Sequence, residues 1–122
     1  MAKIVHDAPS RPIETTVINV KTSPWFDPKN NPNHVYIGRY NKKYGTSKWA
    51  NPHHMKRDTD EERDRVIRLY RAHVIASGLI NDVHELRGKI LGCWCKPKKC
   101  HGDVLIDILN NYGAEERKDA DT

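Results

Sequence analysis

The chain has 122 residues, of which 37% are hydrophobic and 30% are charged, and it carries a formal net charge of +5. A chain of this length fits one domain, so we do not expect a second independent core. No stretch approaches the roughly 18 apolar residues that a membrane span needs, and the N-terminal segment lacks the apolar block of a secretory signal. These features exclude a membrane-spanning protein and predict a cytoplasmic location.

The first third of the chain is predicted to contain two short strands separated by a loop. Residues 1–14 show no periodicity and are expected to form a flexible arm. Residues 15–20 are rich in β-branched side chains, which favour a strand, and residues 34–37 form a second such run that ends at Gly38. Prolines and Asn and Asp residues between these runs predict a long loop over residues 22–33.

The clearest helix signal follows. Thr59 and Glu62 form a capping-box pattern at the start of a predicted helix that stops at Gly78. The apolar face of this helix would carry Val66, Leu69, Tyr70, His73 and Val74. A short helical segment over residues 79–86 and a strand over residues 89–95 are expected next.

The last helix is predicted to begin near Cys100 and to end at Gly113. Its core-facing residues would be Val104, Leu105, Ile108, Leu109 and Tyr112. Residues 114–122 are strongly charged and are expected to be a disordered tail. The single domain would therefore span residues 15–113.

Strands that alternate with helices predict parallel pairing, so we expect a small three-layer, Rossmann-like α/β domain with a short, mainly parallel sheet. In such sheets ligands collect at the carboxyl ends of the strands. The two long loops that follow Gly38 and Cys95 both begin at predicted strand ends, so we expect them to meet at one site.

The loop after Gly38 is basic. Between Arg39 and Arg57 the chain holds six Lys or Arg residues and no Asp or Glu, which predicts an acidic ligand or partner. Arg39 and Lys48 could pair with phosphate groups. The other ligand-binding candidates are Tyr44 and Trp49, which could stack on a base, and Asn51, whose amide could read a base edge. Aromatic residues of a small domain are, however, more often part of the core.

The second loop turns directly into the last helix. The N-terminus of a helix attracts phosphate, and the neighbouring Lys98 and Lys99 add positive charge. The same field would lower the pKa of the Cys100 thiol and favour its thiolate. Cys100, His101 and Asp103 are therefore the candidate catalytic residues. The alternative is that Cys100 only packs and that Asp103 only interacts with the helix dipole.

The cysteines allow a second interpretation. Cys93, Cys95, Cys100 and His101 supply four donors within nine residues, which is the composition of a structural zinc site. Their spacing lacks the usual pairs separated by two residues, so buried strand cysteines beside a functional histidine remain the alternative.

Several short motifs point to a known family. They are Val35-Tyr36-Ile37-Gly38-Arg39, Lys48-Trp49-Ala50-Asn51-Pro52, Leu86-Arg87-Gly88-Lys89, Cys93-Trp94-Cys95 and Cys100-His101-Gly102-Asp103-Val104-Leu105. In this order they resemble an uncharacterised family of short proteins from bacteriophages and bacteria, and the resemblance covers about residues 15–112. It implies an α/β fold, a phage or bacterial setting and, by analogy of fold alone, nucleotide-related chemistry.

The Cys-His turn also resembles another uncharacterised, Rossmann-like family, in which an arginine follows the Cys-His pair. Gly102 takes that place here, so the role of that arginine would pass to Lys98 or Lys99.

Three functional hypotheses follow. The leading one is a nucleotide-binding protein, an enzyme that acts on a nucleotide, a nucleoside or a nucleic-acid substrate. The alternative is a non-catalytic, zinc-stabilised module that binds nucleic acid or protein. The third is a phage effector that acts in the host cytoplasm and binds a host protein through Trp25 and Phe26, which would lie exposed among prolines.

Overall fold

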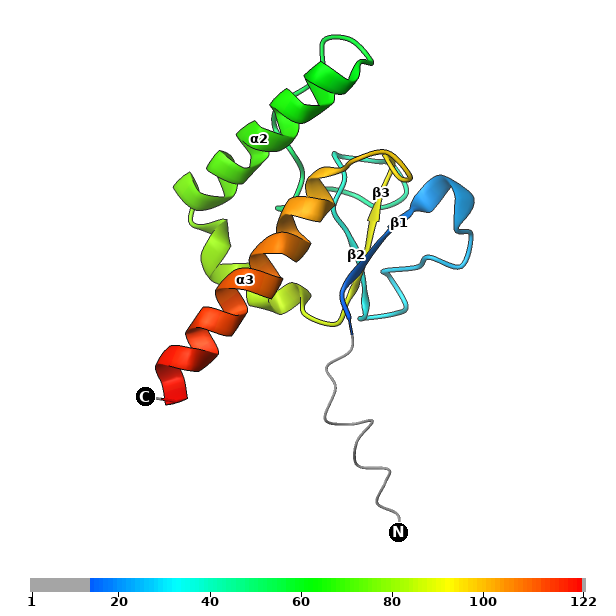
Figure 1. Cartoon of the computed structure of the whole chain (residues 1–122). Helices are drawn as coiled ribbons and strands as arrows, with labels where there is room; N and C mark the ends of the chain where they lie inside the picture. Colours follow the sequence, from blue (N-terminus) through cyan, green and yellow to red (C-terminus); the bar gives the residue numbers. More distant parts are fainter. Residues whose placement is uncertain (1–13, 122) are drawn as a thin grey trace.

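A computed structural model describes residues 14–121, with side chains as far as Asn111 (Figure 1). The predicted arm over residues 1–14 lies outside the described residues, except for Glu14. The elements in chain order are β1 (Thr16–Asn19), the 3-10 turn η1 (Val20–Thr22), β2 (His34–Tyr36), α2 (Asp60–Ala76), the 3-10 segment η2 (Leu79–Leu86), β3 (Ile90–Cys93) and α3 (His101–Asp121). No helix in this part of the chain is both long and apolar enough to cross a membrane.

The sheet has three strands in the order β1-β3-β2, and both pairings are parallel. Leu91 of the central strand lies opposite Val17 of β1 and Val35 of β2. The prediction of a mixed α/β domain with a short parallel sheet is therefore confirmed. The predicted strand over residues 89–95 is shorter than expected, because β3 ends at Cys93.

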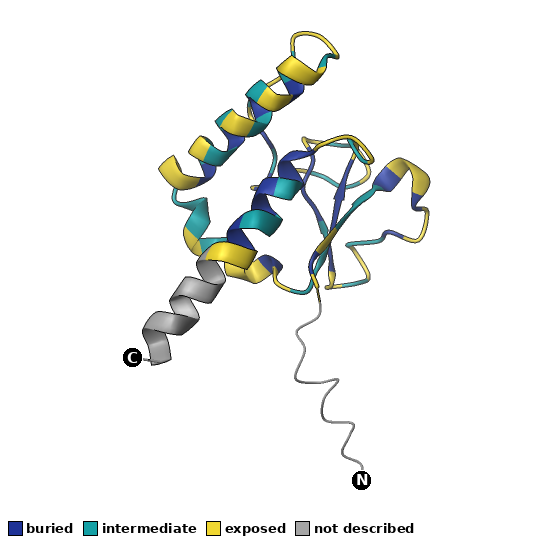
Figure 2. Ribbon diagram, in the orientation of Figure 1, coloured by how far each residue is buried: buried dark blue, intermediate teal, exposed yellow. Residues whose placement is uncertain are grey.

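Alternation along the strands gives the sheet two different faces. One face carries Val17, Val35 and Leu91 and packs against α2, η2 and α3. This sheet face and these helices together form the main core. Both long helices lie on this side (Figure 1). Figure 2 shows the central strand β3 and the first turns of α3 as mostly buried.

The opposite face is covered by η1 and the loop after it. Ile18, Tyr36 and Ile90 pack there with Val20 and Phe26. A Cβ atom on Gly92 would lie 2.5 Å from the Phe26 ring, so a glycine is required for this close approach. Phe26 is only 2% exposed, and the expectation that it is accessible to a host protein is wrong, because its ring completes this second core. Trp25 beside it is 53% exposed.

The predicted N-cap of α2 is confirmed. Thr59 accepts a hydrogen bond from the backbone N–H of Glu62 through its hydroxyl oxygen, at 3.2 Å. The Glu62 carboxylate accepts from the backbone N–H of Lys56 at 2.6 Å and pairs with Arg65 at 2.6 Å. The hydrogen bonds from the Arg65 guanidinium and the Lys56 backbone lower the pKa of Glu62 to about 2.

Glu62→Gln is expected to reduce the loss of stability at acid pH. A carboxylate with a lowered pKa in the folded state stabilises fully above its unfolded value, about 4.3, and loses this contribution as the pH falls towards about 2. Urea unfolding at pH 6 and pH 3 should therefore show a smaller drop in unfolding free energy for the variant than for the wild type. Glu61→Gln removes the same charge one residue away and leaves the Arg65 pair intact, so it serves as the control. Equal drops for wild type and Glu62→Gln would contradict the prediction.

The start of α3 is held by its own side chains. The Cys100 sulfur accepts from the backbone N–H of Gly102 at 3.3 Å, and the Asp103 carboxylate accepts from the N–H of Cys100 at 3.0 Å. This reciprocal arrangement satisfies two of the donors that a helix start leaves unpaired. The helix then runs past Gly113, its predicted end, to Asp121. The Glu, Arg and Lys residues after Gly113 are good helix formers, which favours this continuation.

Candidate functional site

A cavity of about 470 Å³ opens at the carboxyl ends of β2 and β3. It is lined by Tyr36, Gly38, Arg39 and Tyr40 after β2, by Asn51, His53, His54 and Met55, by Arg63, Val66 and Ile67 of α2, by Cys93, Trp94 and Cys95, and by Lys99, Cys100 and His101. Segments that are far apart in the sequence thus form one pocket, and both loops that follow the strands contribute to it.

The cavity is positively charged. Arg39, Arg63 and Lys99 line it, and the described lining residues include no Asp or Glu. Arg39 is held at the wall because its guanidinium donates to the backbone carbonyls of Asn51, at 3.2 Å, and His53, at 3.0 Å. Both acceptors are neutral carbonyl groups, so they do not neutralise the positive charge of Arg39. That charge is available to an anion.

Arg63 is the buried cation of this site. It is only 8% exposed, and one terminal nitrogen pairs with the carboxylate of Asp58 at 2.6 Å. Its Nε–H is buried and has no hydrogen-bond partner among the described residues. A buried donor that belongs to a charged group is costly when it lacks an acceptor. The structure therefore leaves this buried donor unsatisfied within the described part of the chain.

Two aromatic rings line the cavity and remain exposed. Tyr40 is 71% exposed and Trp94 is 45% exposed. The indole N–H of Trp94 donates to the hydroxyl of Tyr36 at 2.8 Å, and that hydroxyl donates to the Arg39 carbonyl at 2.6 Å. These bonds connect the ends of β2 and β3 and fix one wall of the pocket.

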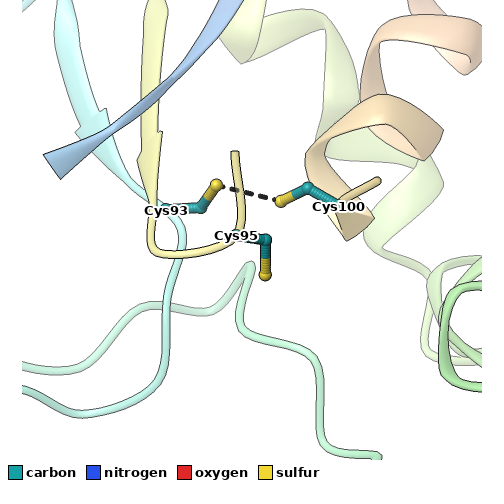
Figure 3. Close-up of side chains that lie close together, drawn as sticks. All are labelled: Cys93, Cys95 and Cys100. Atoms are coloured by element: carbon teal, nitrogen blue, oxygen red, sulfur yellow. Dashed lines mark hydrogen bonds between the residues drawn. The ribbon is translucent and has the colours of Figure 1, made fainter. Parts of the chain in front are cut away.

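The three cysteines gather at the cavity. Their sulfur atoms all lie within 4.8 Å of one another, and those of Cys93 and Cys100 are 3.0 Å apart. Figure 3 shows these two side chains pointing towards each other between the end of β3 and the start of α3, with Cys95 beside them. The three thiols are the described residues best placed to hold a metal ion.

The thiols differ in acidity. Hydrogen bonds with Cys100 and Cys93, together with the nearby guanidiniums of Arg63 and Arg39, lower the pKa of Cys95. The pKa of Cys100 is raised, because its thiol bonds to the two neighbouring sulfurs and is buried. The raised pKa of Cys100 is opposite in direction to the expectation that the helix N-terminus makes this residue the thiolate.

His101 is buried and lines the pocket. Burial lowers its pKa, so the ring is neutral at neutral pH. Its Nε2 lies 2.7 Å from the Ile37 carbonyl oxygen, which assigns the proton to Nε2 as the donor. Nδ1 then carries the lone pair and lies 3.8 Å from the Cys100 sulfur.

Comparison with known proteins gives the family. Residues 18–111 match the family described as Domain of unknown function (DUF4326). The chain belongs to this family. "Uncharacterized protein R718" of Acanthamoeba polyphaga mimivirus is 37% identical over 100 residues, which cover 72% of this chain and 73% of that protein. "Uncharacterized 12.4 kDa protein in nrdA-td intergenic region" of Enterobacteria phage T4 is 45% identical over 53 residues, 39% of this chain and 49% of that protein.

These relatives confirm the resemblance to an uncharacterised family with phage members. The chain spans about half the length of the phage T4 relative. No solved structure matches the chain.

Within this DUF4326 domain, the cavity brings together only some of the predicted site residues. Arg39, Asn51, Lys99, Cys93, Cys95, Cys100 and His101 line it. Asn51 holds the loop in place, because its amide donates to the Val66 carbonyl at 3.0 Å and its carbonyl accepts from the His53 N–H at 2.9 Å. Asp103 does not line the cavity; it caps α3 and pairs with Lys96 at 2.6 Å.

Trp49 and Lys48 lie elsewhere. Trp49 is 4% exposed and belongs to the main core, where its carbonyl accepts from the Tyr70 hydroxyl at 2.7 Å. Lys48 pairs with Asp82 at 3.2 Å and Glu85 at 3.1 Å on η2. Both residues therefore anchor the basic loop to the helical side of the domain.

The remaining two candidates also lie outside the cavity lining. Tyr44 stacks on Tyr36 on the sheet face opposite the helices, with ring centroids 4.8 Å apart. Lys98 lies near the carboxylate of Asp58 at 3.7 Å, whereas its neighbour Lys99 lines the cavity.

Sequence reasoning missed Arg63 and Trp94. Arg63 precedes Val66 by three residues and Tyr70 by seven, so it lies on the apolar face of α2, and this position was a readable signal. Trp94 follows the last residue of β3, and its indole N–H donates to the Tyr36 hydroxyl on the sheet face opposite Cys93, so it lines the cavity from that side.

Proposed function

We propose that this protein binds a nucleotide in the cavity and is an enzyme that acts on a nucleotide, a nucleoside or a nucleic-acid substrate in the cytoplasm. The observation that supports this most is the lining itself: three cations and no described carboxylate at the carboxyl ends of two parallel strands. This is the edge where ligands bind in open α/β sheets, which also favours a Rossmann-like relationship for the domain.

The phosphate groups would lie near Arg39, Arg63 and Lys99. The buried Nε–H of Arg63 has no acceptor in the part of the chain that the structure describes, and a charge-assisted hydrogen bond to phosphate would satisfy it. Lys99 lies at the exposed edge of the lining, where its amine is 3.2 Å from Asp64. An anion that approaches the cavity therefore meets one buried and two more accessible cations.

The base would stack on Tyr40 or Trp94. Both rings are exposed and line the same cavity as the cations, and stacking on an aromatic ring contributes about 1–3 kcal/mol per base. Of the predicted reactive residues, Cys100 and His101 line the cavity. Because the Cys100 thiol is buried and its pKa is raised, His101 is the better candidate for chemistry on the bound ligand.

Two adjacent lysines provide a matched test. Titration calorimetry with nucleoside mono-, di- and triphosphates and a single-stranded oligonucleotide should detect binding by the wild type. Lys99→Ala should weaken nucleotide binding by about 3- to 10-fold, which corresponds to roughly 1 kcal/mol for a partly exposed charge. Lys98→Ala removes the same charge from outside the cavity lining and should leave binding within about twofold.

Absence of nucleotide binding by the wild type would refute the proposal. Equal effects of the two lysine variants would refute the assignment of the cavity. Binding of the oligonucleotide alone would favour a nucleic-acid-binding module instead.

A further inference from the structure

The three sulfur atoms at the cavity have the spacing of metal ligands. In a tetrahedral zinc site with Zn–S bonds of about 2.3 Å, two sulfurs lie about 3.8 Å apart. The sulfurs of Cys93 and Cys100 are 3.0 Å apart, and all three lie within 4.8 Å of one another. Adjustments of about 1 Å would bring them to ligand positions. We propose that Cys93, Cys95 and Cys100 bind one zinc ion, independently of any nucleotide.

The backbone around the cluster is already held in place. Cys93 ends the central strand and lies opposite Asn19 of β1. The side-chain amide of Asn19 donates to the carbonyls of Lys96, at 2.6 Å, and Trp94, at 3.4 Å. Cys100 is fixed at the start of α3 by Asp103. A site whose ligands are positioned before binding loses less conformational entropy when the ion enters.

The surroundings suit a thiolate-bound ion. Three thiolates around Zn²⁺ leave one net negative charge, and the guanidiniums of Arg39 and Arg63, which line the same cavity, would offset it. The ligand atoms that lie mutually within 4.8 Å are the three sulfurs and do not include His101, whose Nδ1 is near the Cys100 sulfur alone, at 3.8 Å. The fourth position of the ion would therefore be open to a water molecule or a ligand.

The competing explanation for the short distance is oxidation, in which Cys93 and Cys100 form a disulfide. The two explanations differ in composition. A zinc site adds one ion per chain and keeps three cysteines reduced, whereas a disulfide removes two hydrogen atoms and leaves Cys95 as a single thiol.

Metal analysis and cobalt titration test the proposal on the full chain. The purified protein should contain about one zinc per chain. After removal of zinc by a chelator, Co²⁺ should produce the strong charge-transfer absorption of thiolate ligands. Cys95→Ala should weaken metal binding by more than about 100-fold, since it removes one of three charged ligands. Met55→Ala removes a sulfur from the same cavity but outside the cluster, and should bind metal like the wild type.

Folded protein without zinc and without a cobalt spectrum would overturn the proposal, as would wild-type metal affinity in Cys95→Ala. A mass two hydrogens lower in metal-free protein would assign the pair to a disulfide and overturn it as well. Circular dichroism of each variant shows that it is folded. Because the readout contains no nucleotide, failure here is distinguishable from failure of the proposed function.

Discussion

Arg63→Met is expected to weaken nucleotide binding by on the order of 30-fold or more, because truncating one partner of a buried, hydrogen-bonded charge pair costs about 2–5 kcal/mol. The same change should leave the ligand-free protein as stable as the wild type or more stable. Arg63 is 8% exposed and its Nε has no partner within residues 14–111, so the ligand-free protein already bears the cost of a poorly satisfied buried charge. Loss of the ion pair with Asp58 should cost little stability, because the Asp58 side chain is 69% exposed.

Calorimetric titration gives the binding constant, and urea unfolding gives the stability of the same variant. Arg68→Met, at an exposed position of the same helix, is the matched control and should change neither quantity beyond about 0.5 kcal/mol. A variant that loses several kcal/mol of stability and keeps its nucleotide affinity would show that Arg63 is a structural residue.

Leu91→Ala is expected to lower the free energy of unfolding by about 3 kcal/mol, within the range of about 2–5 kcal/mol for such truncations in a core. Leu91 has no exposed surface and lies in the central strand, between Val17 and Val35 and under the helices. The neighbouring residues cannot collapse fully into the space, so both apolar transfer energy and packing contacts are lost. Since small domains are stable by about 5–15 kcal/mol, a measurable unfolded fraction on warming is expected.

Urea denaturation of Leu91→Ala and Ile75→Ala measures the effect. Ile75 lies on the outer side of α2 and is 51% exposed, so its truncation should cost less than about 1 kcal/mol. Similar losses in the two variants would mean that the central strand does not carry the main core.

The elements that depend on local signals were predictable. α2 follows from the Thr59 cap and from the apolar spacing of Val66, Tyr70 and Val74, which are all buried. The parallel sheet follows from the alternation of strands with helical segments. The end of α3 was not predictable from Gly113, because one glycine costs a helix about 1 kcal/mol and the good helix formers that follow it, residues 114–118, outweigh that cost.

The candidate site was predictable only in part. Arg39, Cys95, Lys99 and His101 lie next to strand ends or at a helix start, and the topology of a parallel sheet brings such positions together. Trp49 has a basic and polar neighbourhood in the sequence, yet it is buried, because its ring packs in the core and its carbonyl accepts from Tyr70. Whether the side chain of a loop residue is buried depends on segments that are distant in the chain.

By itself, the sequence determined the helical and strand segments and the parallel pairing of the strands. It also determined the two loops that carry the basic residues and the cysteines. All of these features depend on residue patterns within short segments. Only the tertiary structure decided which cations share the cavity, that Arg63 is among them, and that the cysteines meet within ligand distance. The physical reason is that burial and distance between side chains arise from packing of β3, α2 and α3 against one another, and no local pattern encodes those contacts.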